Sequence, residues 1–257
     1  MNMERHYSEV LSALRWYFES KNLALKNALS FRCPLSVEQQ RELRQYYSEY
    51  FVSLVSATEL LLDSEYSHRD KFKESLERTF VFDLLPDGEG NYSYIRELRN
   101  SIIHRGLDVC SAAHVNGDFL LVVAPSSVSN KTGKKSFQAL GFYLLNVISK
   151  CEGVIGQLIA RHLDEVGFLK SELTQDRAVE NARRFISESN AMPEWVKQLA
   201  HDTIATIDHV EVQVATIKSL VDVLCTNALS STDAQQVAQR LPASGQPLSF
   251  NVRPAGV

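Results

Sequence analysis

The residues whose types and spacing suggest chemistry lie in the stretch 91–108, NYSYIRELRNSIIHRGLD. Arg99 carries a permanent charge, and the forked shape of a guanidinium suits the oxygens of a phosphate. Asn100 follows directly, and His104 comes four residues later, which makes the two neighbours on a helix surface. Histidine suits proton transfer because its ordinary pKa is near neutrality. The stretch therefore predicts a site that contacts a phosphate and moves protons.

The local pattern predicts that these residues lie on a helix. Ile95, Leu98 and Ile102 recur at helical spacing, so one face of the segment is apolar. Gly106 follows the last helical residue and can adopt the left-handed conformation that ends a helix. Residues 86–90, PDGEG, predict a turn before the helix.

Arg99 falls on the flank of this apolar face, whereas Glu97, Asn100 and His104 fall on the opposite side. An arginine at the flank needs a partner for its guanidinium or a path to solvent along its stem. Arg99 and His104 are five positions apart, or about 140° around an ideal helix. The two side chains converge only if Arg99 curls round, if the helix loosens towards Gly106, or if a second copy of the helix closes the site.

The run Arg99-Asn100-Ser-Ile-Ile-His104 resembles the motif of the HEPN superfamily: an arginine, a polar residue directly after it, and a histidine a few positions on, inside a helix. The resemblance covers residues 1–165 by architecture, and its specific part is this six-residue motif. It implies an all-helical domain that acts as a metal-independent endoribonuclease, without a cofactor, in a toxin, antiviral defence or stress system. It also implies a homodimer in which two motifs face one cleft.

In such an enzyme the 2′-hydroxyl of the RNA substrate is the nucleophile, so RNA is cleaved and DNA is not. A helix C-terminus favours the protonated imidazole, which suggests that His104 is the general acid. Arg99 would bind the phosphate, and Asn100 would bind the scissile phosphate or orient His104. Three alternatives remain open: an inactive HEPN-like domain that binds RNA, nucleotide or a protein partner, a helical oligomerisation scaffold, or an Arg99 that simply pairs with a carboxylate of the core.

The composition is that of an ordinary globular protein, because 44% of the 257 residues are hydrophobic and 23% are charged. The net charge of −4 means that RNA binding must rest on local basic groups. The candidates near the motif are Arg96, Arg105, Lys131, Lys134 and Lys135. The four cysteines lack metal-ligand spacing, the first residues do not resemble a signal peptide, and the apolar runs are too short to span a bilayer. We expect a cytoplasmic protein.

The rest of the first 165 residues predicts an all-α helical bundle with one small insertion. Helices are expected over 4–29, from Ser36 to about Leu62, over 67–82 and over 136–165. Ser36 and Gln39 have the spacing of a capping box. Glu59 lies among apolar neighbours, and of its two options, pairing with a basic group or facing solvent, we favour solvent. Residues 115–123 predict a β-hairpin with an Asn-Gly turn, followed by a polar basic loop over 126–135.

Residues 166–226 form a helical extension. We expect one helix over 173–188 and another from Met192-Pro193 to about Cys225, with an apolar coiled-coil-like seam over 196–224. The seam packs within the chain or on a partner, which is a second copy or, for a toxin, an antitoxin or sensor protein. His201-Asp202 and Asp208-His209 cannot form a metal site from one helix face alone. Residues 227–257 predict a disordered tail.

Overall fold

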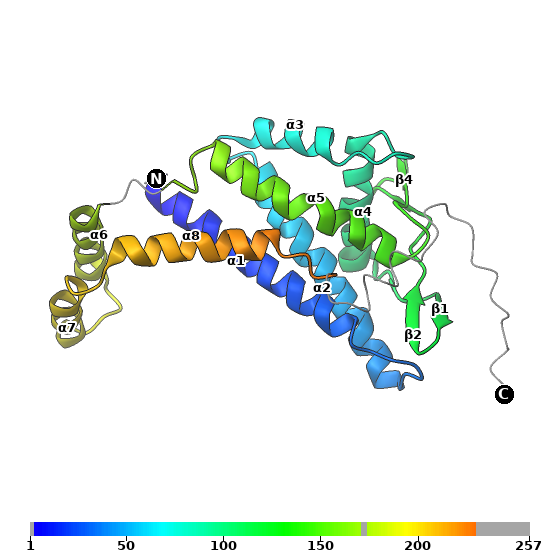
Figure 1. The fold of residues 1–257 in the computed structure, drawn as a ribbon, viewed down its shortest axis with the longest axis horizontal. Helices are drawn as coiled ribbons and strands as arrows, with labels where there is room; N and C mark the ends of the chain where they lie inside the picture. The colour runs from blue at the N-terminus through cyan, green and yellow to red at the C-terminus, as the bar shows by residue number, and fades with distance from the viewer. Residues whose placement is uncertain (1–2, 171–173, 230–257) are drawn as a thin grey trace.

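The computed structural model describes residues 3–170 and 174–229 (Figure 1). This part of the chain is predominantly helical, as the sequence predicts, with two small antiparallel hairpins. The helices are α1 (Met3–Ala28), α2 (Val37–Leu62), α3 (Arg69–Thr79), α4 (Gly88–Arg105), α5 (Leu144–Glu165), α6 (Gln175–Glu188), α7 (Glu194–Ile204) and α8 (His209–Cys225). The strands are β1 (Ala113–Asn116), β2 (Phe119–Val122), β3 (Ser127–Ser129) and β4 (Ser136–Gln138). Among these helices, none has the length and apolar character needed to cross a membrane.

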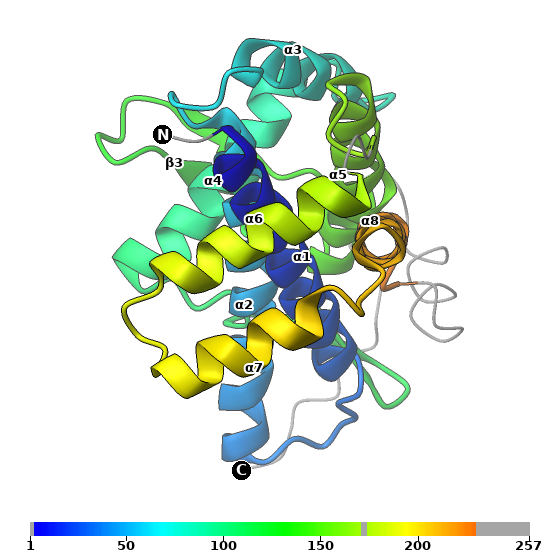
Figure 2. The same cartoon turned by 90° about the vertical axis from the view of Figure 1, so that its left-hand side faces the viewer.

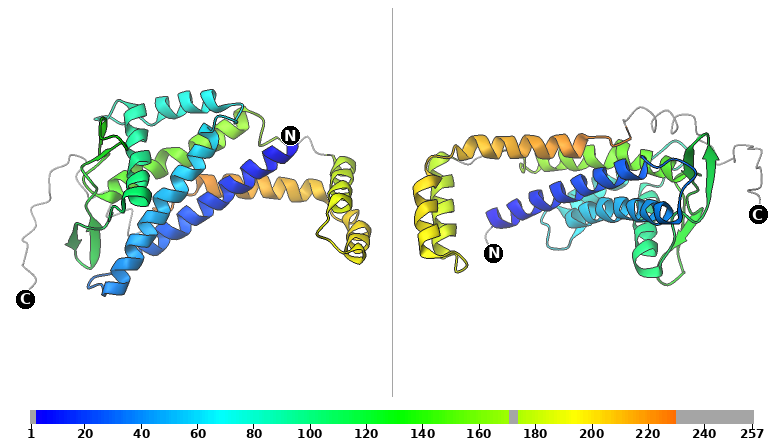
Figure 3. Two further views of the ribbon diagram at one scale, coloured as in Figure 1. Left: turned by 180° about the vertical axis from the view of Figure 1, so that it is seen from behind. Right: turned by 90° about the horizontal axis from the view of Figure 1, so that it is seen from below.

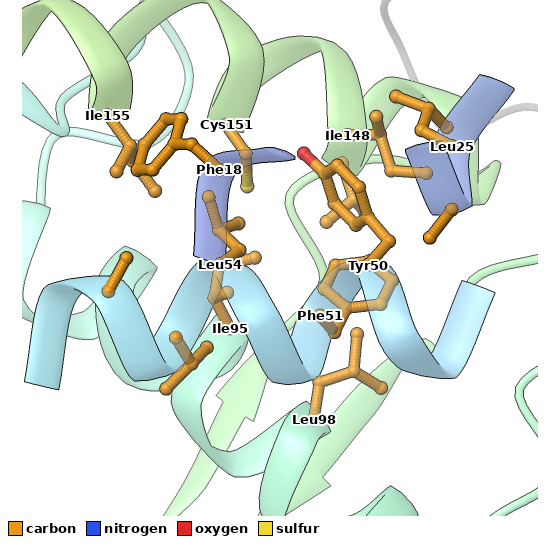
Figure 4. Packing of buried hydrophobic residues seen from close by; sticks show 14 of the residues in the cluster. Phe18, Leu25, Tyr50, Phe51, Leu54, Ile95, Leu98, Ile148, Cys151 and Ile155 are labelled. Carbon is orange, nitrogen blue, oxygen red and sulfur yellow. The ribbon is translucent and has the colours of Figure 1, made fainter. Parts of the chain in front are cut away.

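The framework is the long antiparallel pair α1 and α2. Helix α4 packs on α2, and α5 contacts both helices of the pair through its side chains. The predicted capping box starts α2: the Ser36 side chain accepts a hydrogen bond from the Gln39 backbone, and the Gln39 side chain accepts one from the Ser36 backbone. Figure 4 shows the core where these helices meet, with Phe51 of α2 towards Leu98 of α4 and Tyr50 towards Ile148 of α5. Phe18, Phe51 and Ile155 are buried there, so one apolar core holds α4 in place.

A buried polar network ties this framework to the segment that follows α8. The Glu152 carboxylate of α5 accepts hydrogen bonds from Lys21 at 2.6 Å, from Tyr50 at 2.8 Å and from the Ala228 backbone at 3.0 Å. A buried charge needs such partners because burial alone is costly. Residues 227–229, at the start of the predicted tail over 227–257, are thus held against α5. From residue 230 onwards the tail lies outside the described residues.

The insertion between α4 and α5 is larger than expected. The predicted Asn-Gly hairpin is confirmed as β1–β2, in which Asn116 pairs with Phe119 and Gly117 has φ of 65°. A second hairpin, β3–β4, follows it and pairs Val128 with Phe137. The helix predicted over 136–165 is wrong in its first turns, because residues 136–138 form β4 and α5 begins only at Leu144.

The extension also differs from the prediction. The single helix expected up to Cys225 is two helices, because the chain breaks between Ile204 and His209. Asp208 caps the second helix, since its side chain accepts a hydrogen bond from the Glu211 backbone at 2.9 Å. The coiled-coil seam is therefore not continuous. Figure 3 shows that α8 runs along the framework, and Figure 2, which views α8 end-on, shows α6 and α7 lying across its far end.

Two boundaries of smaller helices also shift. The helix predicted over 67–82 is α3 and ends at Thr79. The turn predicted over 86–90 is shorter, because Asp87 already caps α4: its side chain accepts a hydrogen bond from the Gly90 backbone at 2.9 Å.

Candidate functional site

Helix α4 carries the motif and has a defined end, as the sequence predicts. Gly106 has φ of 67°, in the left-handed region, and hydrogen bonds from the Gly106 and Leu107 backbones close on the Ser101 carbonyl. Ile95 and Leu98 are buried as expected, and Ile102 is half-buried. The buried apolar side chains therefore fix the orientation of α4 and of its motif residues.

One stripe of α4 faces solvent. It consists of Arg96, Asn100, Ile103 and His104, of which Asn100 is half-buried and the other three are exposed. These residues cover about a quarter of the circumference of the helix at 100° per residue. Ile103 is the unusual member, because 46% of this large apolar side chain is exposed among polar neighbours. The stripe is the surface of the motif helix that a substrate or partner can reach.

Arg99 lies at one edge of this stripe and is not free. Its Nη2 donates to Oε2 of Glu59 on α2, and only 13% of its side chain is exposed. Our expectation that Glu59 faces solvent was therefore wrong, although 41% of its side chain remains exposed. The reason is the crossing of α2 and α4, at which the hydroxyl groups of Thr58 and Tyr92 are 2.7 Å apart. Arg99 therefore has the partner for its guanidinium that an arginine on the flank of the apolar face needs.

The Arg99 guanidinium is nevertheless not fully satisfied. Its Nε is buried and has no hydrogen-bond partner among the described residues. A half-buried cation with one carboxylate partner and one unused donor retains the capacity to bind a further anion. Glu59 therefore occupies one side of this group only.

His104 and Asn100 occupy the open side of the helix. Neither side chain has a hydrogen-bond or ion-pair partner within residues 3–170 and 174–229, and His104 lies in the last turn, beside the exposed Gly106. No hydrogen bond joins His104 to Arg99 in this part of the chain. The fold thus brings Asn100 and His104 onto one surface, with Arg99 at its edge facing α2.

Glu97 differs most from the predicted arrangement of α4. It was expected on the polar face, but it is only 7% exposed. Arg96 and Arg105 lie beside it, with nitrogen–oxygen distances of 3.9 and 3.7 Å, and Arg105 also donates to the Ser101 hydroxyl. The two arginines expected to bind RNA therefore already face a carboxylate. Both side chains remain partly accessible, because 45% of Arg96 and 39% of Arg105 are exposed.

Arg44 of α2 is a basic residue at the site that the sequence analysis did not identify. Its Nη2 is 3.4 Å from the Gly106 carbonyl oxygen and its Nε is 3.7 Å from the Asp108 carboxylate. A cation at this position complements the partial negative charge of the end of α4. No motif could have indicated it, because the contact depends on how α2 crosses α4.

The three predicted RNA-binding lysines lie on the turn between β3 and β4 and are all exposed: Lys131, Lys134 and Lys135. The turn is part of a hairpin and not the open loop expected over 126–135. Asn130 holds it, since its backbone bonds Gly133 and Lys135 and its side chain accepts from the Lys135 backbone. Both β3 and β4 pack against α4, so this basic turn is attached to the motif helix.

The histidines and acidic residues around the end of α7 do not form a metal site. His209 Nε2 is 2.9 Å from the Ile204 carbonyl oxygen, and Asp208 serves as a helix cap. No cluster of three metal-ligating side chains exists among the described residues. The four cysteines are free thiols, and burial raises the pKa of Cys110 to about 12, which keeps it protonated and unreactive.

Comparisons with protein-family models, with curated proteins and with solved structures found no match to this chain.

Proposed function

We propose that this chain is a metal-independent endoribonuclease with a HEPN-like domain, and that Arg99, Asn100 and His104 of α4 perform the reaction. The observation that carries the proposal is the outer stripe of α4, where Asn100 and His104 are accessible together at a capped helix end beside Arg99. The setting that the resemblance implies, a cytoplasmic toxin or antiviral defence system, belongs to the same proposal.

The reaction needs no group from outside the protein and RNA. The 2′-oxygen forms a bond to the adjacent phosphorus, the bond from phosphorus to the 5′-oxygen breaks, and a 2′,3′-cyclic phosphate results. The leaving 5′-oxygen takes a proton from His104, which lies exposed in the last turn of α4. Arg99 stabilises the charge on the phosphate, and Asn100 donates a hydrogen bond to it.

In this mechanism Arg99 exchanges Glu59 for phosphate, or binds phosphate through its unused Nε while Glu59 holds its other side, which requires the side chain to turn so that this buried atom becomes accessible. The first path requires the half-exposed Glu59 to turn into solvent. On either path, the pairing with Glu59 determines how readily Arg99 binds phosphate.

A second copy of α4 facing the first would supply another histidine, which can accept the proton of the 2′-hydroxyl. Ile103 supports this arrangement, since an apolar side chain that is 46% exposed at the edge of the stripe, between Arg96 and Arg99 around the helix, suits a helix-to-helix contact. We therefore include a homodimer through α4 in the proposal.

One observation favours a second candidate function. Because Arg99 is paired with Glu59, and Arg96 and Arg105 with Glu97, the domain resembles a binding module that holds RNA, nucleotide or a protein partner without cleaving RNA. The exposed lysines of the β3–β4 turn would serve RNA binding equally well.

Incubation of purified protein with a mixed RNA pool in excess EDTA separates the two candidates. The proposal expects cleavage by the wild-type protein and none by Arg99→Ala or His104→Ala. Binding of the same RNA by all three proteins, without any cleavage, would favour the binding module.

A further inference from the structure

Helices α6 and α7 and the first half of α8, residues 209–216, form a unit that we call the arm. The helix α7 packs against α6, and α6 packs against α8, whereas neither has a substantial contact with α1 to α5. Figures 1 and 3 show α6 and α7 at the far end of α8, beyond the framework. The arm is therefore a projection that the rest of the described chain leaves uncovered.

The arm exposes an unusual amount of apolar surface. Six of the thirteen large hydrophobic side chains that are exposed in the described residues lie within residues 185–214. Two of them are aromatic, Phe185 at 68% and Trp195 at 72% exposure, and Leu199 is 61% exposed. The others are Ile207, Val212 and Val214. Single exposed apolar residues need no explanation, but this concentration on one projecting unit is typical of a binding surface.

The second half of α8, which joins the arm to the framework, is firmly attached. Leu220 and Leu224, in the second half of α8, are each 2% exposed. A Cβ atom added at Gly156 of α5 would lie 1.9 Å from the Leu224 carbonyl oxygen, so the two helices are in close contact. At its other end, Gln175 of α6 bonds the Ile207 carbonyl at 2.7 Å and accepts from the His209 backbone at 2.9 Å. The exposed side chains therefore lie on helices that are held in place by packing and hydrogen bonds.

We propose that the arm is a self-association surface whose occupant is the arm of a second copy of this chain. Val212 and Val214 lie about 200° apart around α8, so one contact can cover only one of them. At roughly 100 Å² of exposed area each, the five side chains that remain offer about 500 Å² per chain. Two arms together then bury about 1,000 Å², the smallest area expected of a biological interface.

The charges around the apolar residues suit a two-fold pairing. Exposed Arg183 lies before the loop between α6 and α7, and exposed Glu188 lies at its edge. Arg184 and Glu194, also exposed, already face Glu180 and Lys197 of the same arm. In a symmetric dimer each copy contributes the same patch, so a patch with both signs can pair its basic side with the acidic side of the other. A nucleic acid would need a single positive sign instead.

This contact does not depend on the proposed ribonuclease. The arm and α4 lie towards opposite ends of the molecule in Figure 1, so one two-fold contact through the arm leaves the α4 stripe free. A chain that used both surfaces would form assemblies larger than a dimer.

Light-scattering measurements of the molar mass of the full chain over a concentration series test the proposal. The arm variants are Trp195→Glu and, on another helix, Phe185→Ser. The matched control is Leu84→Glu, which changes a 77% exposed leucine in the loop between α3 and α4. Circular dichroism and thermal unfolding monitor the fold of each variant, and Ile103→Glu tests the α4 contact separately.

We expect the wild-type protein to be a dimer or larger and each arm variant to have half its mass at the same concentration. The control should keep the wild-type mass. The arm variants should halve the mass whether or not the α4 contact exists. Without that contact, loss of the arm contact converts a dimer to a monomer. With it, the same loss converts a tetramer to a dimer. A wild-type monomer at every concentration, unchanged mass in both arm variants, or an equal loss in the control would each overturn the proposal.

Discussion

His162 of α5 should make the stability of this protein depend on pH. Its side chain is buried, at 2% exposure, and its Nε2 is 2.9 Å from the Tyr66 hydroxyl. Its Nδ1 is also buried and has no hydrogen-bond partner among the described residues. Burial, assisted by the nearby charges of His68 and Lys71, lowers the pKa of His162 from 6.5 to about 4.

The direction in which stability changes with pH depends on whether the folded or the unfolded chain binds the proton more readily. In the unfolded chain the imidazole titrates near its ordinary pKa of about 6.5, whereas in the folded chain it stays neutral down to about pH 4. The stabilising contribution of the neutral ring is therefore present above pH 6.5 and is lost as the pH falls from 6.5 towards 4. The full shift corresponds to about 3 kcal/mol, of which about 2 kcal/mol is lost between pH 7 and pH 5.

Urea unfolding of the wild-type protein at pH 7 and pH 5 measures this loss. His162→Gln removes the titrating group, so its free energy of unfolding should fall by about 2 kcal/mol less over the same interval. His104→Gln, at an exposed histidine, serves as the matched control and should retain the wild-type dependence on pH. An equal loss of stability in His162→Gln and in the wild-type protein would refute the reasoning.

Three further substitutions test contacts described above. Gly156→Ala places a methyl group against the Leu224 carbonyl oxygen and should cost about 1–3 kcal/mol by thermal unfolding; Gly153→Ala, with open space around it, should cost nothing measurable. Glu59→Gln removes the anion that competes for Arg99, so RNA should bind about fivefold more tightly in a titration, and weaker binding would contradict that role. Alanine at all three lysines of the β3–β4 turn should lower the salt dependence of RNA binding by up to about 2 in log–log slope; an unchanged slope would exclude this turn.

The features that the sequence predicted correctly have local causes. The start of α2 follows from Ser36 and Gln39, three residues apart, and the end of α4 follows from Gly106. The β1–β2 turn follows from Asn116-Gly117, which suits positive φ. Each of these signals acts between residues within one turn of the chain, so no knowledge of the tertiary structure is needed.

The features that it missed depend mostly on distant contacts. The pairing of Glu59 with Arg99 joins residues 40 positions apart, at a helix crossing that no periodicity describes. The burial of Glu97 was also missed, although Arg105 eight positions later was a possible counter-charge. The break before α8 did have a local signal, because Asp208 followed by Glu211 has the spacing of a helix start, and the apolar seam concealed it.

The central claim, a metal-independent attack by a 2′-hydroxyl, is tested most directly with a DNA oligonucleotide that contains one ribonucleotide. In excess EDTA the wild-type protein should cut only on the 3′ side of that ribonucleotide and leave a 2′,3′-cyclic phosphate. Arg99→Ala and His104→Ala, once shown to be folded, should leave the oligonucleotide intact. Cleavage at deoxynucleotides, or cleavage by folded His104→Ala at the wild-type rate, would contradict the account.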